Sequence, residues 1–131
     1  MFSERQVAVG DVLVGADAPV AVQSMTNTRT DDVEATLHQI RALATAGAVI
    51  VRVAVPDEKA AGAVNRLVAE SPVPLIADVH FDHTLAVAAL QAGAAGVRIN
   101  PGNIGGDDKV REVVEAAKAR GAVIRVGVNS G

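Results

Sequence analysis

Three arginines occupy equivalent places in three similar stretches of the sequence. The stretches read AGAVIVRVAVP, AGAAGVRINPG and RGAVIRVGVNSG, and each joins Gly-Ala to an apolar run that contains an arginine, namely Arg52, Arg98 or Arg125. A planar guanidinium group donates paired hydrogen bonds whose geometry matches phosphate. Three such groups in one pocket indicate an anionic ligand with several oxygens, and phosphate or diphosphate is the common anion that offsets three positive charges.

Further polar residues lie at the ends of apolar runs, and side chains two residues apart in a strand point to the same face. The pairs that share a face are Asp78 with His80, Arg98 with Asn100, and Arg125 with Asn129 if the strand continues that far. We predict that these residues and Arg52 converge on one pocket. Asp78 and His80 are then the candidate catalytic residues, and the arginines and asparagines are candidate substrate-binding residues.

These residues also have plainer structural explanations. A single arginine in a strand is more often paired with a carboxylate, and Asp78 could serve as that partner. Three arginines in a repeated unit favour a ligand instead, because the strands offer only this one carboxylate. His80 could be a rim histidine without a catalytic role, while His38 and His83 are expected on the surface. No metal-ligand spacing appears in the sequence.

Two polar segments could also contact the ligand. The sequence PGNIGG follows Asn100 and precedes a helix predicted to start near Asp107. Its glycines let backbone amides approach a bound group, and a helix start favours anions. The segment QSMTN is polar enough for ligand contact, but it could equally satisfy the backbone of a turn.

A repeated helix-Gly-strand unit positions these residues. Strands are predicted near 20–25, 48–54, 74–79, 95–100 and 123–128, with four amphipathic helices between them. Before them, QVAVGDVLVG alternates apolar and polar residues around Gly-Asp, which predicts an N-terminal β-hairpin. Alternation of apolar strands and helices indicates an α/β fold with a parallel sheet.

Five such strands leave two architectures open, a doubly wound sheet and part of a (β/α)8 barrel. No glycine-rich G-x-G-x-x-G turn follows the first strand, which counts against a dinucleotide-binding sheet. Charged residues inside successive strands suit a barrel whose interior faces a ligand. We therefore predict a partial TIM (β/α)8-type barrel of about five strands and four helices, preceded by the hairpin.

Composition narrows the classes of function. The chain has 131 residues, no cysteine and a formal net charge of −3. Without a basic face, nucleic-acid binding is not expected. Without cysteine, the chain forms no disulfide and holds no thiolate-bound metal or iron–sulfur cluster. No signal peptide or membrane span is apparent, so we predict a cytoplasmic protein. A whole barrel takes about 250 residues, so we expect the N-terminal portion of a longer protein.

Several motifs resemble those of one enzyme family. PVAVQSMTNTRTDDVEATLHQI, VRVAVP, PLIADVHFD, VRINPGNIG and IRVGVNSG are similar to the N-terminal barrel of the (E)-4-hydroxy-3-methylbut-2-enyl diphosphate synthases. These are iron–sulfur oxidoreductases of the methylerythritol phosphate route of isoprenoid biosynthesis. The similarity runs from about Pro19 to Gly131.

The resemblance implies a substrate, a cofactor and partners. The family reductively opens and dehydrates 2-C-methyl-D-erythritol 2,4-cyclodiphosphate. The electrons come from a [4Fe–4S] cluster, which receives them from flavodoxin or ferredoxin. By motif match, Arg52, Arg98 and Arg125 would bind the diphosphate, assisted by a lysine on a later strand. The other four predicted site residues match polar positions at the same barrel mouth. The family's cluster is held by three cysteines and a glutamate in a C-terminal domain, which closes over the partner's barrel in a homodimer.

The sequence departs from the family by stopping at VGVNSG, before that lysine and every cluster ligand. We therefore expect residues 1–131 to form the N-terminal part of a TIM-barrel substrate-binding domain, with 1–18 as a hairpin cap and 19–131 as βα units. The C-terminal iron–sulfur domain is absent from this chain, which is predicted to be inactive alone.

Two other functions remain open at this point. One is a phosphate- or pterin-binding barrel that transfers groups without redox chemistry, because the barrel is similar to that of pteroate synthases. The other is a non-catalytic half-barrel that assembles with a partner through its open sheet edge.

Overall fold

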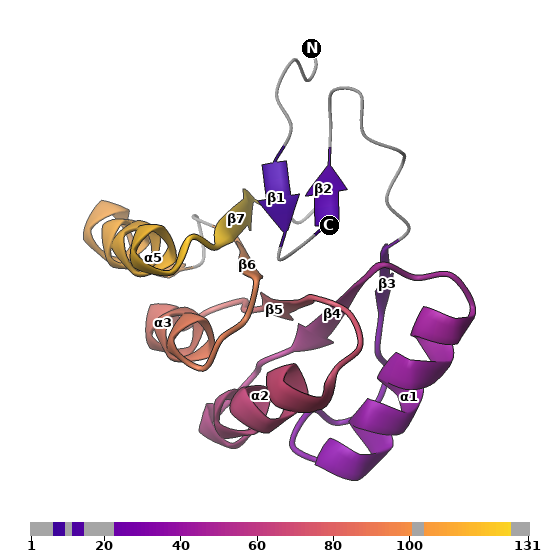
Figure 1. The fold of residues 1–131 in the computed structure, drawn as a ribbon. Helices are drawn as coiled ribbons and strands as arrows, with labels where there is room; N and C mark the ends of the chain where they lie inside the picture. The colour runs from indigo at the N-terminus through magenta and orange to yellow at the C-terminus, as the bar shows by residue number, and fades with distance from the viewer. Residues whose placement is uncertain (1–6, 10–11, 15–22, 101–103, 127–131) are drawn as a thin grey trace.

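A five-stranded parallel sheet is the centre of the fold. The structure is a computed structural model that describes residues 7–9, 12–14, 23–100 and 104–126. The strands are β3 (Gln23–Met25), β4 (Ile50–Ala54), β5 (Leu75–Asp78), β6 (Gly96–Ile99) and β7 (Val123–Val126). The helices are α1 (Val33–Thr45), α2 (Glu58–Glu70), α3 (His83–Gln91) and α5 (Asp107–Arg120). The helices lie in an arc along the outer face of the sheet (Figure 1).

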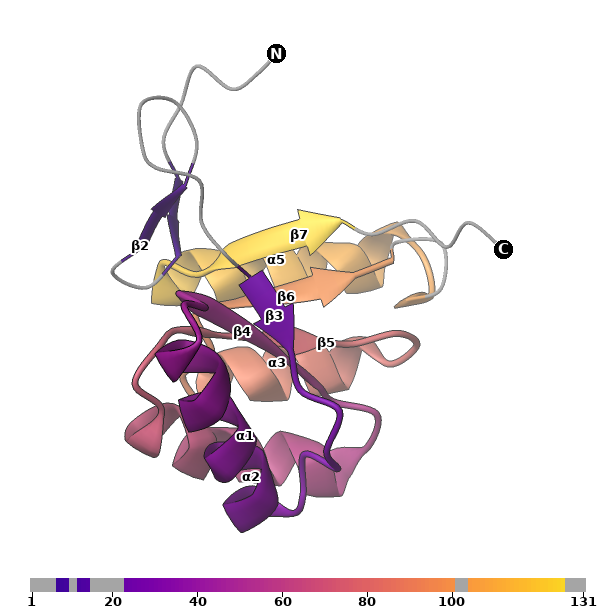
Figure 2. The same ribbon diagram turned by 90° about the vertical axis from the view of Figure 1, so that its right-hand side faces the viewer.

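The order of the strands separates the two architectures. The sheet runs β3-β4-β5-β6-β7, and every neighbouring pair is parallel. Figure 2 shows β5, β6 and β7 running in the same direction. Each strand thus lies beside the next one along the chain, without the reversal of order that defines a doubly wound sheet. The prediction of a partial TIM (β/α)8-type barrel is confirmed.

The predicted N-terminal hairpin is also present. Strands β1 (Val7–Val9) and β2 (Val12–Val14) pair antiparallel, with Val9 opposite Val12, and form a separate two-stranded sheet. Strand β1 lies beside β7 (Figure 1). The division into a cap at 1–18 and βα units at 19–131 stays a prediction.

The repeated Gly-Ala dipeptide ends three of the helices in the same way. The glycines after α1, α3 and α5 have positive φ angles, which are 114° at Gly47, 106° at Gly93 and 65° at Gly121. The N–H of the alanine that follows each glycine donates to a carbonyl five residues earlier, at 2.9–3.1 Å. This left-handed turn is a standard helix stop that glycine adopts without steric cost. The next strands, β4, β6 and β7, start two or three residues after these glycines.

The outer face of the sheet is apolar and packs on the helices. Val51 and Val53 of β4, for example, pack against Leu37, Ile40 and Leu67 of α1 and α2. All five side chains are buried. Burial of such side chains is the main stabilising contribution to the fold.

The inner face begins with a small apolar layer. Ile50 and Ile76 are buried there, with Ala95 and Val123 against them. The layer is tight at Gly96, because a Cβ atom at this residue would lie 2.6 Å from Cγ2 and 2.7 Å from the carbonyl oxygen of Val123. Residues further along the strands lie next to this layer, toward the C-terminal ends of the strands.

None of the helices in the described ranges combines the length and the hydropathy that a membrane-spanning segment requires.

Candidate functional site

A polar layer lies next to the inner apolar layer, toward the C-terminal ends of the strands. Its charged members each come two residues after an inner-layer residue of the same strand, as Arg52 after Ile50, Asp78 after Ile76, Arg98 after Gly96 and Arg125 after Val123. The strand register places Asp78 beside Arg98 and Arg98 beside Arg125. Side chains at paired positions of neighbouring strands share a face. The structure therefore brings these four predicted site residues to one face of the sheet.

Asp78 is the centre of this layer. Its side chain is only 4% exposed, and its Oδ1 accepts a hydrogen bond from Nη1 of Arg98 at 3.3 Å. Its Oδ2 lies 3.4 Å from Nε of Arg52, a buried nitrogen that makes no hydrogen bond. A buried carboxylate needs such partners, because removal of a charge from water is costly. Asp78 thus holds two of the three arginines.

His80 lies at the rim beside the same carboxylate. Its Nε2 is 3.6 Å from Oδ1 of Asp78, and its side chain is 45% exposed. The ring of Phe81 lies 6.0 Å from the imidazole, centre to centre, and Phe81 is among the most exposed hydrophobic residues of the described chain. His80 is therefore open to a ligand or to water, while Asp78 is not.

Arg125 has a different partner, one that the sequence analysis missed. Its Nη1 donates a hydrogen bond to Oε1 of Gln23, which lies on β3 at the other edge of the sheet. On the same strand, Sδ of Met25 is 3.5 Å from Nη2 of Arg52. The period-two pattern of QSMTN places Gln23 and Met25 on one face and could have indicated both residues.

A cavity of about 480 Å³ lies beside these contacts. It is lined by Gln23, Ser24, Met25, Arg52 and Arg125. Two of the three arginines therefore border one open space, where an anion could accept hydrogen bonds from both.

The structure says less about the two predicted asparagines, Asn100 and Asn129. Asn100 follows β6 and is half-buried. Asn129 lies outside the described residues, as does the 101–103 part of the PGNIGG loop. The roles of both asparagines stay predictions.

Helix α3 starts directly after the loop that carries His80. Asp82 caps this helix, and its Oδ1 accepts hydrogen bonds from the hydroxyl group of Thr84 at 2.6 Å and from its N–H at 2.9 Å. These bonds lower the pKa of Asp82, the hydroxyl contact most strongly. His83, expected on the surface, is partly buried: its side chain is 17% exposed, and its Nε2 lies 2.5 Å from Oε2 of Glu112 on α5. His38 is exposed, as predicted.

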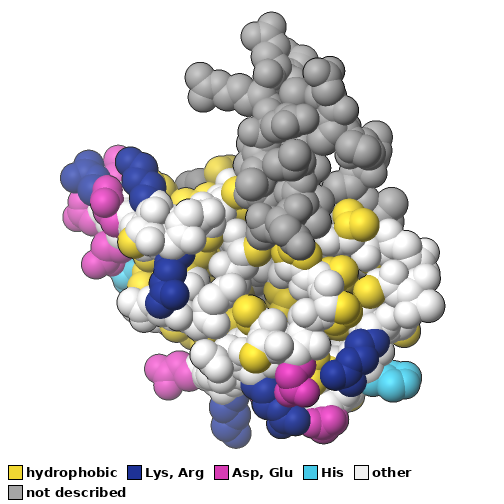
Figure 3. Space-filling view, in the orientation of Figure 1, with side chains coloured by type: hydrophobic (Ala, Val, Ile, Leu, Met, Phe, Trp, Pro, Cys, Tyr) yellow, Lys and Arg dark blue, Asp and Glu magenta, His cyan; other side chains and the backbone are white. Residues whose placement is uncertain are grey.

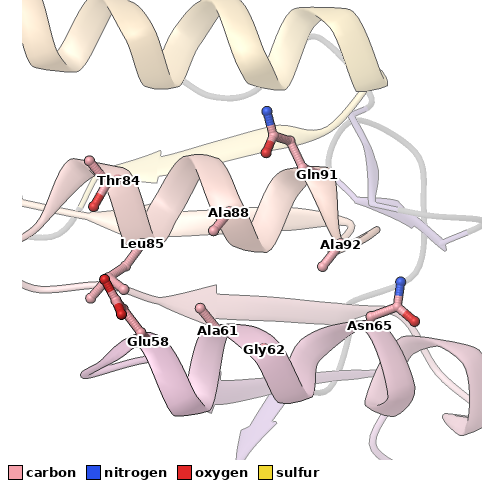
Figure 4. A pocket seen from close by; sticks show the side chains of 9 residues that line it. All are labelled: Glu58, Ala61, Gly62, Asn65, Thr84, Leu85, Ala88, Gln91 and Ala92. Carbon is pink, nitrogen blue, oxygen red and sulfur yellow. The ribbon is translucent and has the colours of Figure 1, made fainter.

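Another hollow lies on the outer face of the sheet. A groove of about 520 Å³ runs between α2 and α3 (Figure 4), with small residues such as Ala61, Gly62 and Ala88 along it. In the orientation of Figure 1, charged side chains gather over the helices at the periphery of the view (Figure 3). None of the predicted site residues lines the groove.

Comparison with known proteins identifies the family. Residues 4–131 match the GcpE TIM-barrel domain. The chain belongs to the GcpE TIM-barrel family. Its relatives include proteins named 4-hydroxy-3-methylbut-2-en-1-yl diphosphate synthase (flavodoxin). The one from Desulfotalea psychrophila is 58% identical over 98% of this chain and 35% of its own length. The one from Magnetococcus marinus is 61% identical over 97% of this chain and 34% of its own length. This GcpE chain thus spans about a third of these relatives.

A solved structure also resembles this GcpE barrel in fold. The dihydropteroate synthase of Yersinia pestis superposes with a TM-score of 0.68 and 16% sequence identity, over 93% of this chain and 46% of the other. At this identity, the likeness shows a shared fold alone.

The GcpE chain does not offer ligands for an iron–sulfur cluster. The sequence has no cysteine. In the ranges that the structure describes, no group of three or more His, Asp or Glu side chains could hold a metal ion. The residues at hand fit an anion and not a cluster.

Proposed function

We propose that this GcpE barrel binds the cyclodiphosphate substrate of 4-hydroxy-3-methylbut-2-en-1-yl diphosphate synthase and is the N-terminal, substrate-binding part of that oxidoreductase. The observation that carries the proposal is the single inner face shared by Arg52, Arg98 and Arg125. The names of the relatives support the choice of reaction. The chain alone is expected to be inactive, because it supplies no cluster ligands.

The charge of the site suits a diphosphate. The three guanidinium groups share the face with one carboxylate, Asp78, which pairs with Arg52 and Arg98, so the positive charges exceed the negative ones by two. A guanidinium group can donate two parallel hydrogen bonds to the oxygens of a phosphate group. This interaction is stronger where water is excluded. Arg52 and Arg125 border the cavity and are placed to bind the diphosphate, while Arg98 extends the same row. Asn100 and Asn129 are proposed to add neutral donors.

The two candidate catalytic residues differ in their access to substrate. His80 is nearly half exposed and lies at the rim, so it is the better placed group to give a proton to the departing oxygen. Asp78 is buried beneath the arginines and contacts His80 through Oδ1. We propose that a carboxylate in this position helps to orient the imidazole.

The electron-transfer parts of the reaction lie outside these residues. We propose that the [4Fe–4S] cluster is held by residues beyond the matched third of the enzyme, and that flavodoxin or ferredoxin supplies electrons. The names of the relatives specify flavodoxin for those proteins. We also propose that the full-length enzyme is a homodimer and is located in the cytoplasm.

A chimeric enzyme tests this function. Residues 4–131 would replace the matching part of the Desulfotalea psychrophila synthase, and cyclodiphosphate binding and turnover would be measured. Arg98→Ala is expected to weaken binding by about 2–4 kcal/mol, because it removes a desolvated contact to the anion. Arg120→Ala, an exposed change at the end of α5, is the control. An unchanged dissociation constant for Arg98→Ala would contradict the assignment.

The same chimera tests the alternative of a pterin-binding barrel. The likeness to dihydropteroate synthase shows fold only and does not favour a pterin ligand. We expect binding of the cyclodiphosphate and none of a pterin. The reverse result would replace the proposed function with this alternative.

A further inference from the structure

We infer that Gln23 is a positioning residue, which holds the Arg125 guanidinium at the cavity without neutralising its charge. The inference rests on the proposed function, since it concerns how the site keeps its affinity for an anion. It assigns a role to a residue of β3, the strand that also supplies Ser24 and Met25 to the cavity.

The contact joins the two edges of the sheet. Gln23 lies on β3 and Arg125 on β7, the first and last strands of the order, and they are 102 residues apart in the sequence. The carboxamide Oε1 accepts a hydrogen bond from Nη1 of Arg125. Both side chains are exposed, so the packing of neighbouring residues does not by itself fix the orientation of the guanidinium.

The three arginines are held by two different kinds of partner. Arg52 and Arg98 both contact the carboxylate of Asp78. Arg125 forms no ion pair with any residue that the structure describes, and its acceptor is a neutral amide. A carboxylate at this place would offset the positive charge, whereas an amide oxygen orients the guanidinium and leaves the charge for a ligand.

The position of the contact links it to anion binding. Gln23, Arg125 and Arg52 all line the cavity of about 480 Å³. An anion in this cavity lies between an arginine held by Asp78 and one held by Gln23. The side-chain amide of Gln23 therefore determines where the second arginine can meet the ligand.

Two substitutions at residue 23 separate orientation from charge. The probe is pyrophosphate, titrated calorimetrically into the 131-residue chain at low ionic strength. Gln23→Leu removes the acceptor, and we expect affinity to fall roughly threefold. Gln23→Glu keeps the size and the contact but pairs Arg125 with a negative charge, so we expect a fall of roughly tenfold and a weaker salt dependence.

Gln91→Glu is the matched control, because it makes the same charge change on the exposed outer side of α3, at the groove of Figure 4. We expect it to leave pyrophosphate affinity unchanged. Thermal unfolding of each variant, followed by circular dichroism, verifies that the fold is retained. In the chimeric synthase, Gln23→Leu should raise KM and leave kcat unchanged.

The outcomes for Gln23 and for the proposed function can be told apart. If the unaltered chain binds pyrophosphate and both residue-23 variants bind it equally well, the role of Gln23 is overturned and the anion site stands. If the unaltered chain and the chimera bind no pyrophosphate, the proposed function fails. In that case the ¹⁵N order parameter of the Arg125 Nε–H, compared between the unaltered chain and Gln23→Leu, still tests the contact. An unchanged order parameter would overturn it.

Discussion

At the scale of single residues, one buried carboxylate organises much of the candidate site. Asp78 contacts Arg52 and Arg98, whose side chains are each 26% exposed. The arrangement keeps two positive charges close together without a ligand, which would otherwise be repulsive. Asp78 therefore contributes to stability as well as to the preparation of the site.

Replacement of this carboxylate should be costly. Asp78→Ala is expected to lower the free energy of unfolding by about 1–3 kcal/mol, because two partly buried guanidinium groups lose their ion-pair partner. Chemical denaturation of the chain measures this effect. Asp31→Ala is the control, since Asp31 forms its ion pair with the exposed Arg29. An equal loss of stability in the two variants would contradict the organising role of Asp78.

The sequence indicated most of these residues and offered Asp78 as a partner for an arginine, but it did not indicate the partner of Arg125. The shared face of Asp78 and Arg98 followed from the strand period, since both lie in regular strands. The contact of Gln23 with Arg125 could not be predicted, because the curvature that brings β3 and β7 together depends on the whole sheet. The partial burial of His83 depends likewise on the packing of α3 against α5.

At the scale of elements, close packing of the inner layer sets where the strands can lie. Gly96 on β6 leaves no space for a side chain, because Val123 of β7 and Ile76 of β5 already occupy it. Gly62 on α2 is the opposite case, with no atom near the position of a Cβ. The two glycines therefore predict opposite effects of the same substitution.

Gly96→Ala should lower the free energy of unfolding by about 1–3 kcal/mol, because the clash includes the backbone oxygen of Val123, which cannot turn away. Gly62→Ala should raise it by about 0.5–1 kcal/mol, since alanine favours the helical conformation at an open site. Thermal or denaturant unfolding of both variants measures the difference. A tolerated alanine at residue 96 would show that β6 and β7 are less closely packed than described.

The start of α3 predicts a dependence of stability on pH. The native pKa of Asp82 is lowered, first by its bond with the Thr84 hydroxyl, so the ionised form favours the folded state. This stabilisation is present above the usual pKa of aspartate and is lost as the pH falls through the lower native pKa. Thr84→Val should move the native pKa of Asp82 back toward its usual value. NMR titration of the Asp82 carboxyl group measures both values, and an unchanged pKa in the variant would disprove the stated cause.

At the scale of the whole molecule, the sheet has two edges. Strand β3 pairs only with β4, and β7 pairs only with β6, among the residues that the structure describes. Val126 on β7 is 65% exposed. Unpaired strand edges with apolar side chains favour association with other chains.

The isolated chain is therefore expected to associate as its concentration rises. Val126→Lys should shift sedimentation toward the monomer, because a charged side chain at a strand edge opposes pairing. Lys118→Ala on the exposed face of α5 is the control and should leave the association unchanged. A chain that sediments as a monomer at all concentrations would argue against pairing through the sheet edge.

The strict match of strand order to chain order has a consequence for how the protein is made. Each strand from β4 to β7 finds its neighbour already synthesised, and each helix packs beside the one before it. Contacts between segments that are close in sequence form rapidly. On the ribosome the sheet can therefore grow by one strand at a time, in the order of translation. The contact of Asp78 with Arg98 can form only after β6 has been added to the sheet. The contact of Gln23 with Arg125, which completes the anion site, can form only after β7 has been synthesised.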